Sequence, residues 1–170
     1  MADGYLLDTS IASIAFDAGA PSHAAVQTRL RAFGDDPIWI CSVSVGEVEY
    51  GLHVSPRIDA VRQQAVRKNL HRYTVLKVDR HTGQTYGQLR TELFRTYGSQ
   101  DARGRLKEKR PESLIDRTTS RELGIQENDL WIVSTAVQYN LRFVTRDHME
   151  RILEAARKVY SYDRAITWKL

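Results

Sequence analysis

Four acidic residues stand at junctions of the sequence pattern, where a short apolar run ends or a helical pattern begins. They are Asp8, Glu47, Asp129 and Asp147. Carboxylate oxygens are the hard ligands that Mg²⁺ and Mn²⁺ prefer. A bound cation of this kind lowers the pKa of a water ligand and stabilises the charge that builds on a phosphate. If the four side chains met in one pocket, they would suit metal-assisted hydrolysis of a phosphodiester.

A cluster of carboxylates needs a positive charge to offset its own repulsion. Two unit charges roughly 4 Å apart repel by about 4 kcal/mol at an effective dielectric constant of ~20. The chain is mildly basic, with 25 Lys and Arg against 21 Asp and Glu and a net charge of +4. That balance permits a polyanionic partner, and an acidic pocket within it favours a divalent cation.

Each acid also has a purely structural interpretation. Asp8 and Asp129 could cap the helices that begin beside them. Glu47 could close a capping box with Ser44, and Asp147 could hold a turn. Acidic residues are favoured in the first turn of a helix whatever the function, so spacing alone does not decide between the two interpretations.

Sulfur and nitrogen ligands offer no alternative metal site in the sequence. Cys41 is the only cysteine, which excludes an intrachain disulfide and a cysteine-built zinc or iron–sulfur site. The five histidines lie in separate segments without ligand spacing, and none is paired with a recognisable Ser or Cys nucleophile. Oxygen ligands therefore remain as the candidates.

Apolar runs alternate with helical patterns along the chain, which predicts an α/β fold with a mostly parallel sheet. Strands are predicted at 5–7, 38–41, 74–78 and 141–145, with an edge strand at 159–162. Helices are predicted at 11–16, 22–33, 44–51, 57–71, 81–97 and 127–139.

This order of elements predicts that the acids converge. In an open parallel sheet the carboxyl ends of all strands face the same way, so residues that follow different strands share one crevice. Asp8 and Asp147 each follow a predicted strand, and Glu47 lies in the first turn after another. Asp129 differs in placement, because it precedes the strand at 141–145.

The 170 residues, 42% of them apolar and 27% charged, predict one domain over 1–170. The polar stretch 98–126 is interpreted as an insertion, with a short helix near Leu106 and another starting at Pro111. No apolar stretch approaches the ~20 residues of a membrane span. The first five residues lack the pattern of a signal peptide, so we expect a cytoplasmic location and no membrane partner.

Four blocks of the chain carry a resemblance to a known family. They read YLLDTS at 5–10, SVSVGEVEYG at 42–51, NDLWI at 128–132 and LRFVTRD at 141–147. In order and spacing these blocks resemble the signature blocks of PIN-domain ribonucleases, most of all the VapC toxins of toxin–antitoxin modules. The resemblance covers nearly the whole chain except 98–126, which is longer than in the usual toxin.

The resemblance implies a three-layer α/β/α PIN-like domain and a catalytic metal. Asp8, Glu47 and Asp129 would bind Mg²⁺ or Mn²⁺, and Asp147 would complete the acidic quartet. It also implies supporting roles for four neighbouring polar residues. Thr9 or Ser10 would orient a metal-bound water, Asn128 would support Asp129, and Thr145 would hold Asp147 in place.

By the same resemblance the chain would be a metal-dependent endoribonuclease that cleaves tRNA or rRNA. It would be held inactive by a cognate VapB-like antitoxin and would form a homodimer. Basic side chains would grip the RNA phosphates. The candidates are Arg57, Arg62, Arg67, Lys68, Arg103 and Arg105. The alternative is a catalytically silent PIN-like module that only binds RNA or a partner protein.

Overall fold

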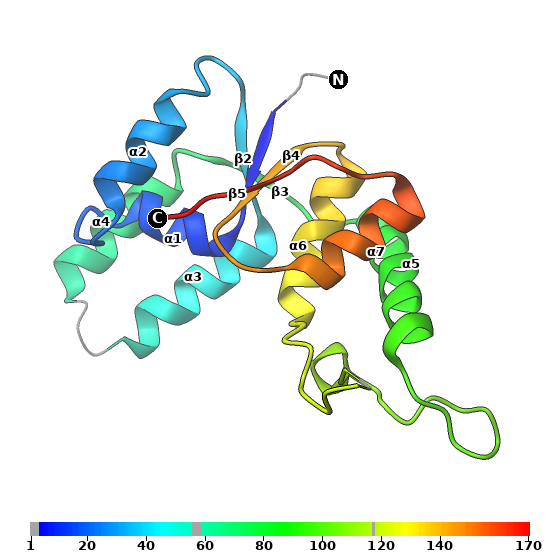
Figure 1. The fold of residues 1–170 in the computed structure, drawn as a ribbon. Coiled ribbons are helices and arrows are strands. Elements are labelled where there is room, and N and C mark those ends of the chain that lie inside the picture. The colour runs from blue at the N-terminus through cyan, green and yellow to red at the C-terminus, as the bar shows by residue number, and fades with distance from the viewer. Residues whose placement is uncertain (1–3, 56–58, 117) are drawn as a thin grey trace. The chain divides into compact units, whose positions relative to one another are not determined.

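The computed structural model describes residues 4–55, 59–116 and 118–170 (Figure 1). Arg57, one of the expected RNA contacts, lies outside these residues. The chain forms two compact units. The first takes its described residues from Met1–Lys77, Leu141–His148 and Arg164–Leu170, and the second consists of Val78–Asn140 and Met149–Asp163.

A five-stranded sheet runs through the first unit, and every strand pair in it is parallel. The strand order is β3-β2-β1-β4-β5. The chain therefore builds one half of the sheet outward from β1 and the other half outward from β4, so the order reverses between these two neighbours. The expected α/β class with a parallel sheet is confirmed. The strands are β1 (Tyr5–Leu7), β2 (Ile38–Cys41), β3 (Thr74–Leu76), β4 (Arg142–Thr145) and β5 (Ala165–Thr167).

The first unit contains four helices, with α1 at their centre. Helix α1 contacts α2, α3 and α4, and it also contacts β4. Apolar residues at helical spacing on α1, such as Ile11 and Phe16, join Leu7, Ile40 and Val144 of the strands in one buried core. This core fixes the direction in which α1 leaves β1. The helices are α1 (Thr9–Phe16), α2 (His23–Arg31), α3 (Ser42–Val54) and α4 (Ala60–Leu70).

The C-terminal carbonyls of α1 are satisfied by side chains from its neighbours. His23 Nδ1 lies 2.8 Å from the Ile14 oxygen, and Gln27 donates to the Ala15 carbonyl at 2.9 Å. From α4, Asn69 donates to the carbonyl of Phe16 at 2.8 Å. Carbonyls at a helix end have no partner within the helix, so these three bonds let α1 end inside the packed unit.

An ion pair ties the end of α1 to α4. Both oxygens of Asp17 accept hydrogen bonds from the guanidinium of Arg62, at 2.8 and 2.7 Å. A Cβ on Gly19 would lie 2.7 Å from the Arg62 Cζ, so a larger residue there would displace this guanidinium. The bonds from Arg62, followed by a bond from the Gly19 amide, lower the pKa of Asp17 against the opposing effect of burial.

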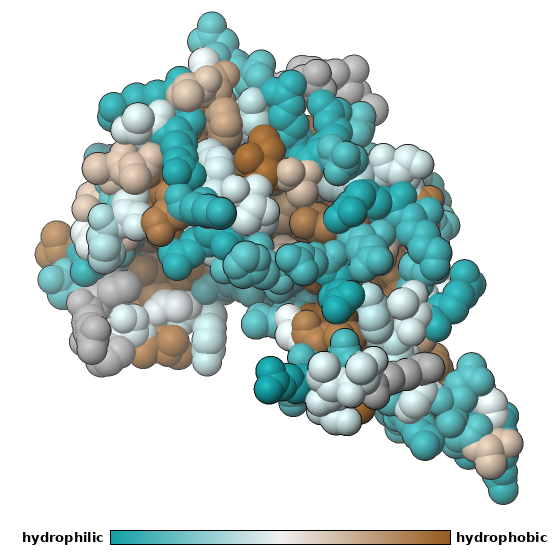
Figure 2. Space-filling view, viewed as in Figure 1, coloured by the Kyte–Doolittle hydropathy of each residue, from teal (hydrophilic) through white to brown (hydrophobic). Residues whose placement is uncertain are grey.

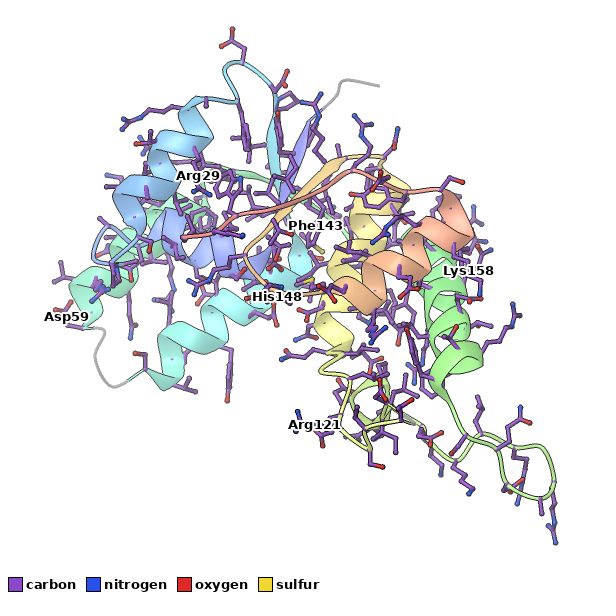
Figure 3. All side chains as sticks on the ribbon, in the orientation of Figure 1. Arg29, Asp59, Arg121, Phe143, His148 and Lys158 are labelled. Carbon is purple, nitrogen blue, oxygen red and sulfur yellow. The ribbon has the colours of Figure 1, made fainter. Side chains whose placement is uncertain are left out.

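Three helices pack against one another in the second unit. An ion pair joins the helix at Arg80–Tyr97 to the helix at Glu150–Tyr160. The buried carboxylate of Glu92 on the former accepts a hydrogen bond from Lys158 on the latter, which Figure 3 labels. This bond and a hydrogen bond from Thr96 lower the pKa of Glu92. The helices are α5 (Arg80–Tyr97), α6 (Glu127–Gln138) and α7 (Glu150–Tyr160).

The segment between α5 and α6 begins with a tight hairpin, residues 99–108, which projects beyond the end of α5 (Figure 1). Gln100 and Leu106 form an antiparallel bridge, so the helix expected near Leu106 is wrong. Asp101 closes the turn by accepting from the amides of Arg103 and Arg105, at 2.8 and 3.0 Å. The turn residue Gly104 has φ +73°, a conformation that favours glycine.

The helix expected to start at Pro111 is a single 3₁₀ turn, η1 (Pro111–Ser113). The edge strand expected at 159–162 is wrong, because Val159 and Tyr160 form the last turn of α7. Helix α7 ends at Ser161, whose φ of 53° is left-handed. The strand that does lie at the sheet edge is β5, a few residues later.

No helix in the described part of the chain is both long and apolar enough to cross a membrane.

Asp17→Asn should lower the free energy of unfolding at neutral pH, because the mutant loses the charge that Arg62 holds. The pKa of Asp17 is depressed in the folded state, so its stabilisation is present at neutral pH and is lost as the pH falls through the folded pKa. The difference between mutant and wild type should therefore shrink below about pH 4. Urea unfolding at several pH values measures this, with the exposed Asp35→Asn as control. A difference that persists unchanged at low pH would contradict it.

Candidate active site

Asp8 follows β1 directly and is the N-cap residue of α1, but its side chain makes no capping bond. Only its backbone carbonyl takes part in the helix start, accepting from the amide of Ala12 at 2.8 Å. The side chain is 1% exposed. The capping interpretation therefore does not account for the carboxylate of Asp8.

Two hydroxyls donate to the same oxygen of the Asp8 carboxylate. Ser10 lies 2.6 Å and Thr145 2.8 Å from Oδ2. Burial nevertheless raises the pKa of Asp8, and the negative charge of Asp147 adds to the rise, while the two hydroxyls oppose it. Among the described residues no Lys, Arg or His forms an ion pair with Asp8. The site thus holds a buried carboxylate without a cationic partner from the described residues.

Thr145 connects Asp8 to the loop after β4. Its side chain is fully buried, and its hydroxyl also accepts from the amide of Asp147 at 3.0 Å. Asp147 itself is exposed, in the loop that continues to His148, which Figure 3 labels. One hydroxyl thus fixes both the orientation of Asp8 and the backbone position of Asp147.

Glu47 joins this group through Thr9. The Thr9 hydroxyl donates to Glu47 Oε2, across 38 residues of sequence. Helix α3 begins at Ser42, with Cys41 as its N-cap, so the capping box expected between Ser44 and Glu47 is wrong. Glu47 is half-buried and does not cap the helix.

Ser44 is a residue that the sequence pattern did not single out for the site. It lies in the first turn of α3 at 1% exposure, three residues before Glu47. Among the described residues its hydroxyl is the one buried side-chain oxygen without a hydrogen-bond partner. The only signal in the sequence was the spacing of a capping box, which points to a different role.

Asn128 and Asp129 lie in the first turn of α6, in the second unit. The helix begins at Glu127, and its N-cap is Gln126, so neither residue holds the capping position. Asp129 is half-buried and Asn128 is exposed. The amide of Glu127 donates to Glu112 Oε1 at 2.9 Å, which ties this turn to the preceding segment.

The donor chemistry of these residues fits a hard divalent cation. The described residues contain no group of three His, Cys, Asp or Glu side chains that could hold a metal ion. Magnesium typically uses one or two protein carboxylates and keeps several waters, so a smaller set of oxygen donors suffices. Asp8 and Glu47 supply carboxylate oxygens, and hydroxyls already orient both.

The basic residues expected to contact RNA differ in whether they are already paired. Arg62 binds Asp17, Arg67 makes a bidentate contact with Glu49 at 2.8–3.0 Å, and Arg105 binds Asp101 at 3.0 Å. Lys68 and Arg103 make no ion pair within the described residues. Of the expected contacts that the structure describes, Lys68 and Arg103 are therefore the ones that keep an uncompensated charge.

Comparison with known proteins places this geometry in a wider context. A comparison with curated proteins finds no match. Among solved structures, VapBC2 from Rickettsia felis bound to a DNA fragment from its promoter is similar over 97% of this chain and 98% of its own, with 24% identity and a TM-score of 0.64. DNA-bound VapBC from Salmonella typhimurium covers 98% of this chain and 99% of its own, with 18% identity and a TM-score of 0.63.

A third similar structure is VapC20 from Mycobacterium tuberculosis, a toxin that cleaves the sarcin-ricin loop. It is 13% identical, has a TM-score of 0.52, and matches over 89% of this chain and 95% of its own. At these identities the similarities establish the fold. The PIN domain family model matches residues 5–158, which confirms the expected fold class, and the chain therefore belongs to the PIN domain family.

Proposed function

We propose that this chain is a metal-dependent endoribonuclease, the toxin of a toxin–antitoxin pair, which hydrolyses phosphodiester bonds of tRNA or rRNA in the cytoplasm. Membership of the PIN family supports a nuclease. The observation that carries the proposal is the buried carboxylate of Asp8, oriented by Ser10 and Thr145 where the strand order reverses. Ligands bind at this reversal point in open α/β sheets.

The proposal assigns the metal to four carboxylates. Asp8, Glu47 and Asp147 belong to the first unit, and Asp129 belongs to α6. We also propose that residues 1–170 are a single PIN-like domain. A bound Mg²⁺ or Mn²⁺ supplies an activated water and neutralises the charge that builds on the phosphate. Its positive charge also offsets the cost of burying Asp8 in ionised form.

Hydroxyl and amide side chains hold the carboxylates in the orientation that the metal needs. Ser10 and Thr145 both donate to Oδ2 of Asp8, and Thr9 donates to Glu47. The proposal gives Asn128 the same task for Asp129. Fixed carboxylates lose less entropy when the cation binds, and misplaced ones slow the reaction.

We further propose a VapB-like antitoxin and a second copy of the chain as partners, and RNA contacts from the basic residues. The similarity to VapBC structures supports the antitoxin. A basic antitoxin side chain would neutralise the carboxylates in place of the cation. Lys68 and Arg103 are the expected RNA contacts whose charges are not compensated by an ion pair in the described residues.

Asp8→Asn should abolish divalent-dependent cleavage, by at least about a hundredfold, because the amide keeps the shape of the carboxylate but removes its charge. Labelled RNA incubated with Mn²⁺ measures cleavage, and circular dichroism verifies the fold. Asp35→Asn, on the surface, should cleave like wild type. Full cleavage by Asp8→Asn would refute the nuclease mechanism. A wild type that binds RNA without cleaving it under any metal would favour the silent binding module.

Mn²⁺ should raise the melting temperature of the wild-type protein much more than that of Asp8→Asn. A ligand that binds only the folded state stabilises it by about 2.7 kcal/mol at a hundredfold excess over its dissociation constant. Thermal unfolding with MnCl₂ and with EDTA measures the shift without reference to activity. Equal shifts in the two proteins would show that the cation binds elsewhere.

Thr145→Val should reduce cleavage by about 10- to 100-fold, because valine fills the same space but gives no hydroxyl to Asp8 or to the Asp147 amide. Thr145→Ser keeps the hydroxyl and should restore most of the activity. The concentration of Mn²⁺ at half-maximal rate should rise in the valine variant alone. If the serine variant were as slow as the valine variant, packing of the methyl group would explain the loss instead.

A further inference from the structure

A hollow of about 740 Å³ lies in the second unit, between one face of α5 and the root of the 99–108 hairpin. Phe94 and Leu106 form the apolar part of its lining. Gly87 also lines the hollow and adds no side chain to fill it. The volume lies within the roughly 300–1,000 Å³ typical of small-molecule sites. The hollow therefore has room for a ligand of the size of a nucleotide.

Three cations line this hollow. Arg90 is held in place, donating to the carbonyl of Lys109 at 2.6 Å and to Glu127 at 3.0 Å, with its guanidinium over the Phe94 ring. Arg95 has a side chain that is 73% exposed and reaches Glu92 only at 3.5 Å. Lys109 is exposed and makes no ion pair within the described residues. Arg95 and Lys109 can therefore turn to an anion.

The two carboxylates of the hairpin accept hydrogen bonds from within the hairpin. Glu108, which also lines the hollow, accepts from the amide of Ser99 at 2.8 Å and from its hydroxyl at 2.5 Å. Asp101 accepts from turn amides. These bonds hold the pKa of both carboxyls below its usual range. Glu127 compensates Arg90, and Glu108 is engaged by Ser99, so Arg95 and Lys109 give the rim of the lining its positive charge.

Other cations of the hairpin and of the residues that follow it add to the positive charge near the hollow. Arg103, Lys107 and Arg110 are exposed and make no ion pair within the described residues. Figure 2 shows the projecting segment as mostly hydrophilic. An extended polyanion that entered the hollow would thus meet further cations along the hairpin.

We propose that this hollow binds a nucleotide of single-stranded RNA, with the base or sugar against Phe94 and Leu106 and the phosphate between Arg95 and Lys109. A nucleotide combines a base or sugar that can pack on the apolar side chains with a phosphate that can pair with the cations at the rim. The carboxylates of an acidic peptide would pair with the cations but would not pack on the apolar side chains. This proposal rests on the proposed function and specifies how the nuclease holds its substrate.

The hollow is connected to the helix that carries Asp129. Arg90 forms its wall and binds Glu127, which lies two residues before Asp129 in the first turn of α6. Tyr86 also donates to Glu127 and stacks on Trp131 of the same helix, with ring centroids 3.7 Å apart. A nucleotide in the hollow is therefore held by the same side-chain network that fixes the start of α6.

Gly87→Glu tests the proposal without disturbing the fold. A Cβ at Gly87 meets no atom within 4 Å, and a residue other than glycine favours the helix. The added carboxylate would lie in the lining of the hollow and should weaken RNA binding about tenfold at low salt. Gly83→Glu is the matched control: it adds the same charge one turn earlier, also meets nothing within 4 Å, and lies outside the lining.

Binding is measured on the full chain in EDTA, by the anisotropy of a fluorescein-labelled single-stranded oligoribonucleotide. We expect weakening by Gly87→Glu and a change below twofold for Gly83→Glu. Lys109→Gln should reduce the slope of log affinity against log salt by about 0.7. Equal effects of the two glutamates would show a general charge effect and overturn the proposal. Unchanged binding by Gly87→Glu would also overturn it.

The same proteins are then tested for cleavage with Mn²⁺, which separates this proposal from the proposed function. If wild type cleaves RNA and Gly87→Glu binds normally, the hollow is not the RNA site but the nuclease stands. If wild type binds RNA through the hollow and never cleaves, the nuclease fails and the hollow stands. Labelled polyglutamate is the last probe. If Gly87→Glu weakened binding of polyglutamate but not of RNA, the hollow would be assigned to an acidic peptide and the proposal would be overturned.

Discussion

The candidate site depends on the cost of burying one ionised carboxylate. Asp8 is 1% exposed, and its pKa is raised by that burial and by the nearby Asp147. Hydrogen bonds from Ser10 and Thr145 lower the cost but add no positive charge. A fold that keeps such a group without a cationic side chain among the described residues requires either a proton or a bound cation at this point.

Sheet topology decides which residues can support that carboxylate. Leu7 of β1 pairs with Val144 of β4, so the next residue of each strand, Asp8 and Thr145, come side by side. The strand order reverses between these two strands, which is where ligands bind in open α/β sheets. The hydroxyl that orients Asp8 is therefore a consequence of strand register.

Local patterns in the sequence predicted β1 to β4 and the position of Asp8, because a short apolar run followed by capping residues is a local signal, but they missed β5. The bond from Thr145 to Asp8 joins residues 137 apart and depends on the pairing of β1 with β4, which no local pattern contains. For the same reason, no local pattern showed that Arg62 and Arg67 form ion pairs within the chain. Both were predicted as RNA contacts, but their carboxylate partners lie 45 and 18 residues away in sequence.

The segment 98–126 shows how folding can separate charges that the sequence mixes. It mixes five acids with seven bases, five of the bases within 103–110, so the sequence suggests a solvated and mildly basic stretch. In the folded hairpin, however, Asp101 and Glu108 turn inward to backbone amides, since only an acceptor can satisfy these donors. Arg103 and Lys107 have only donors, which the amides cannot use, and so they face solvent. Backbone hydrogen bonding thus turns a mixed sequence into a positive surface beside the hollow.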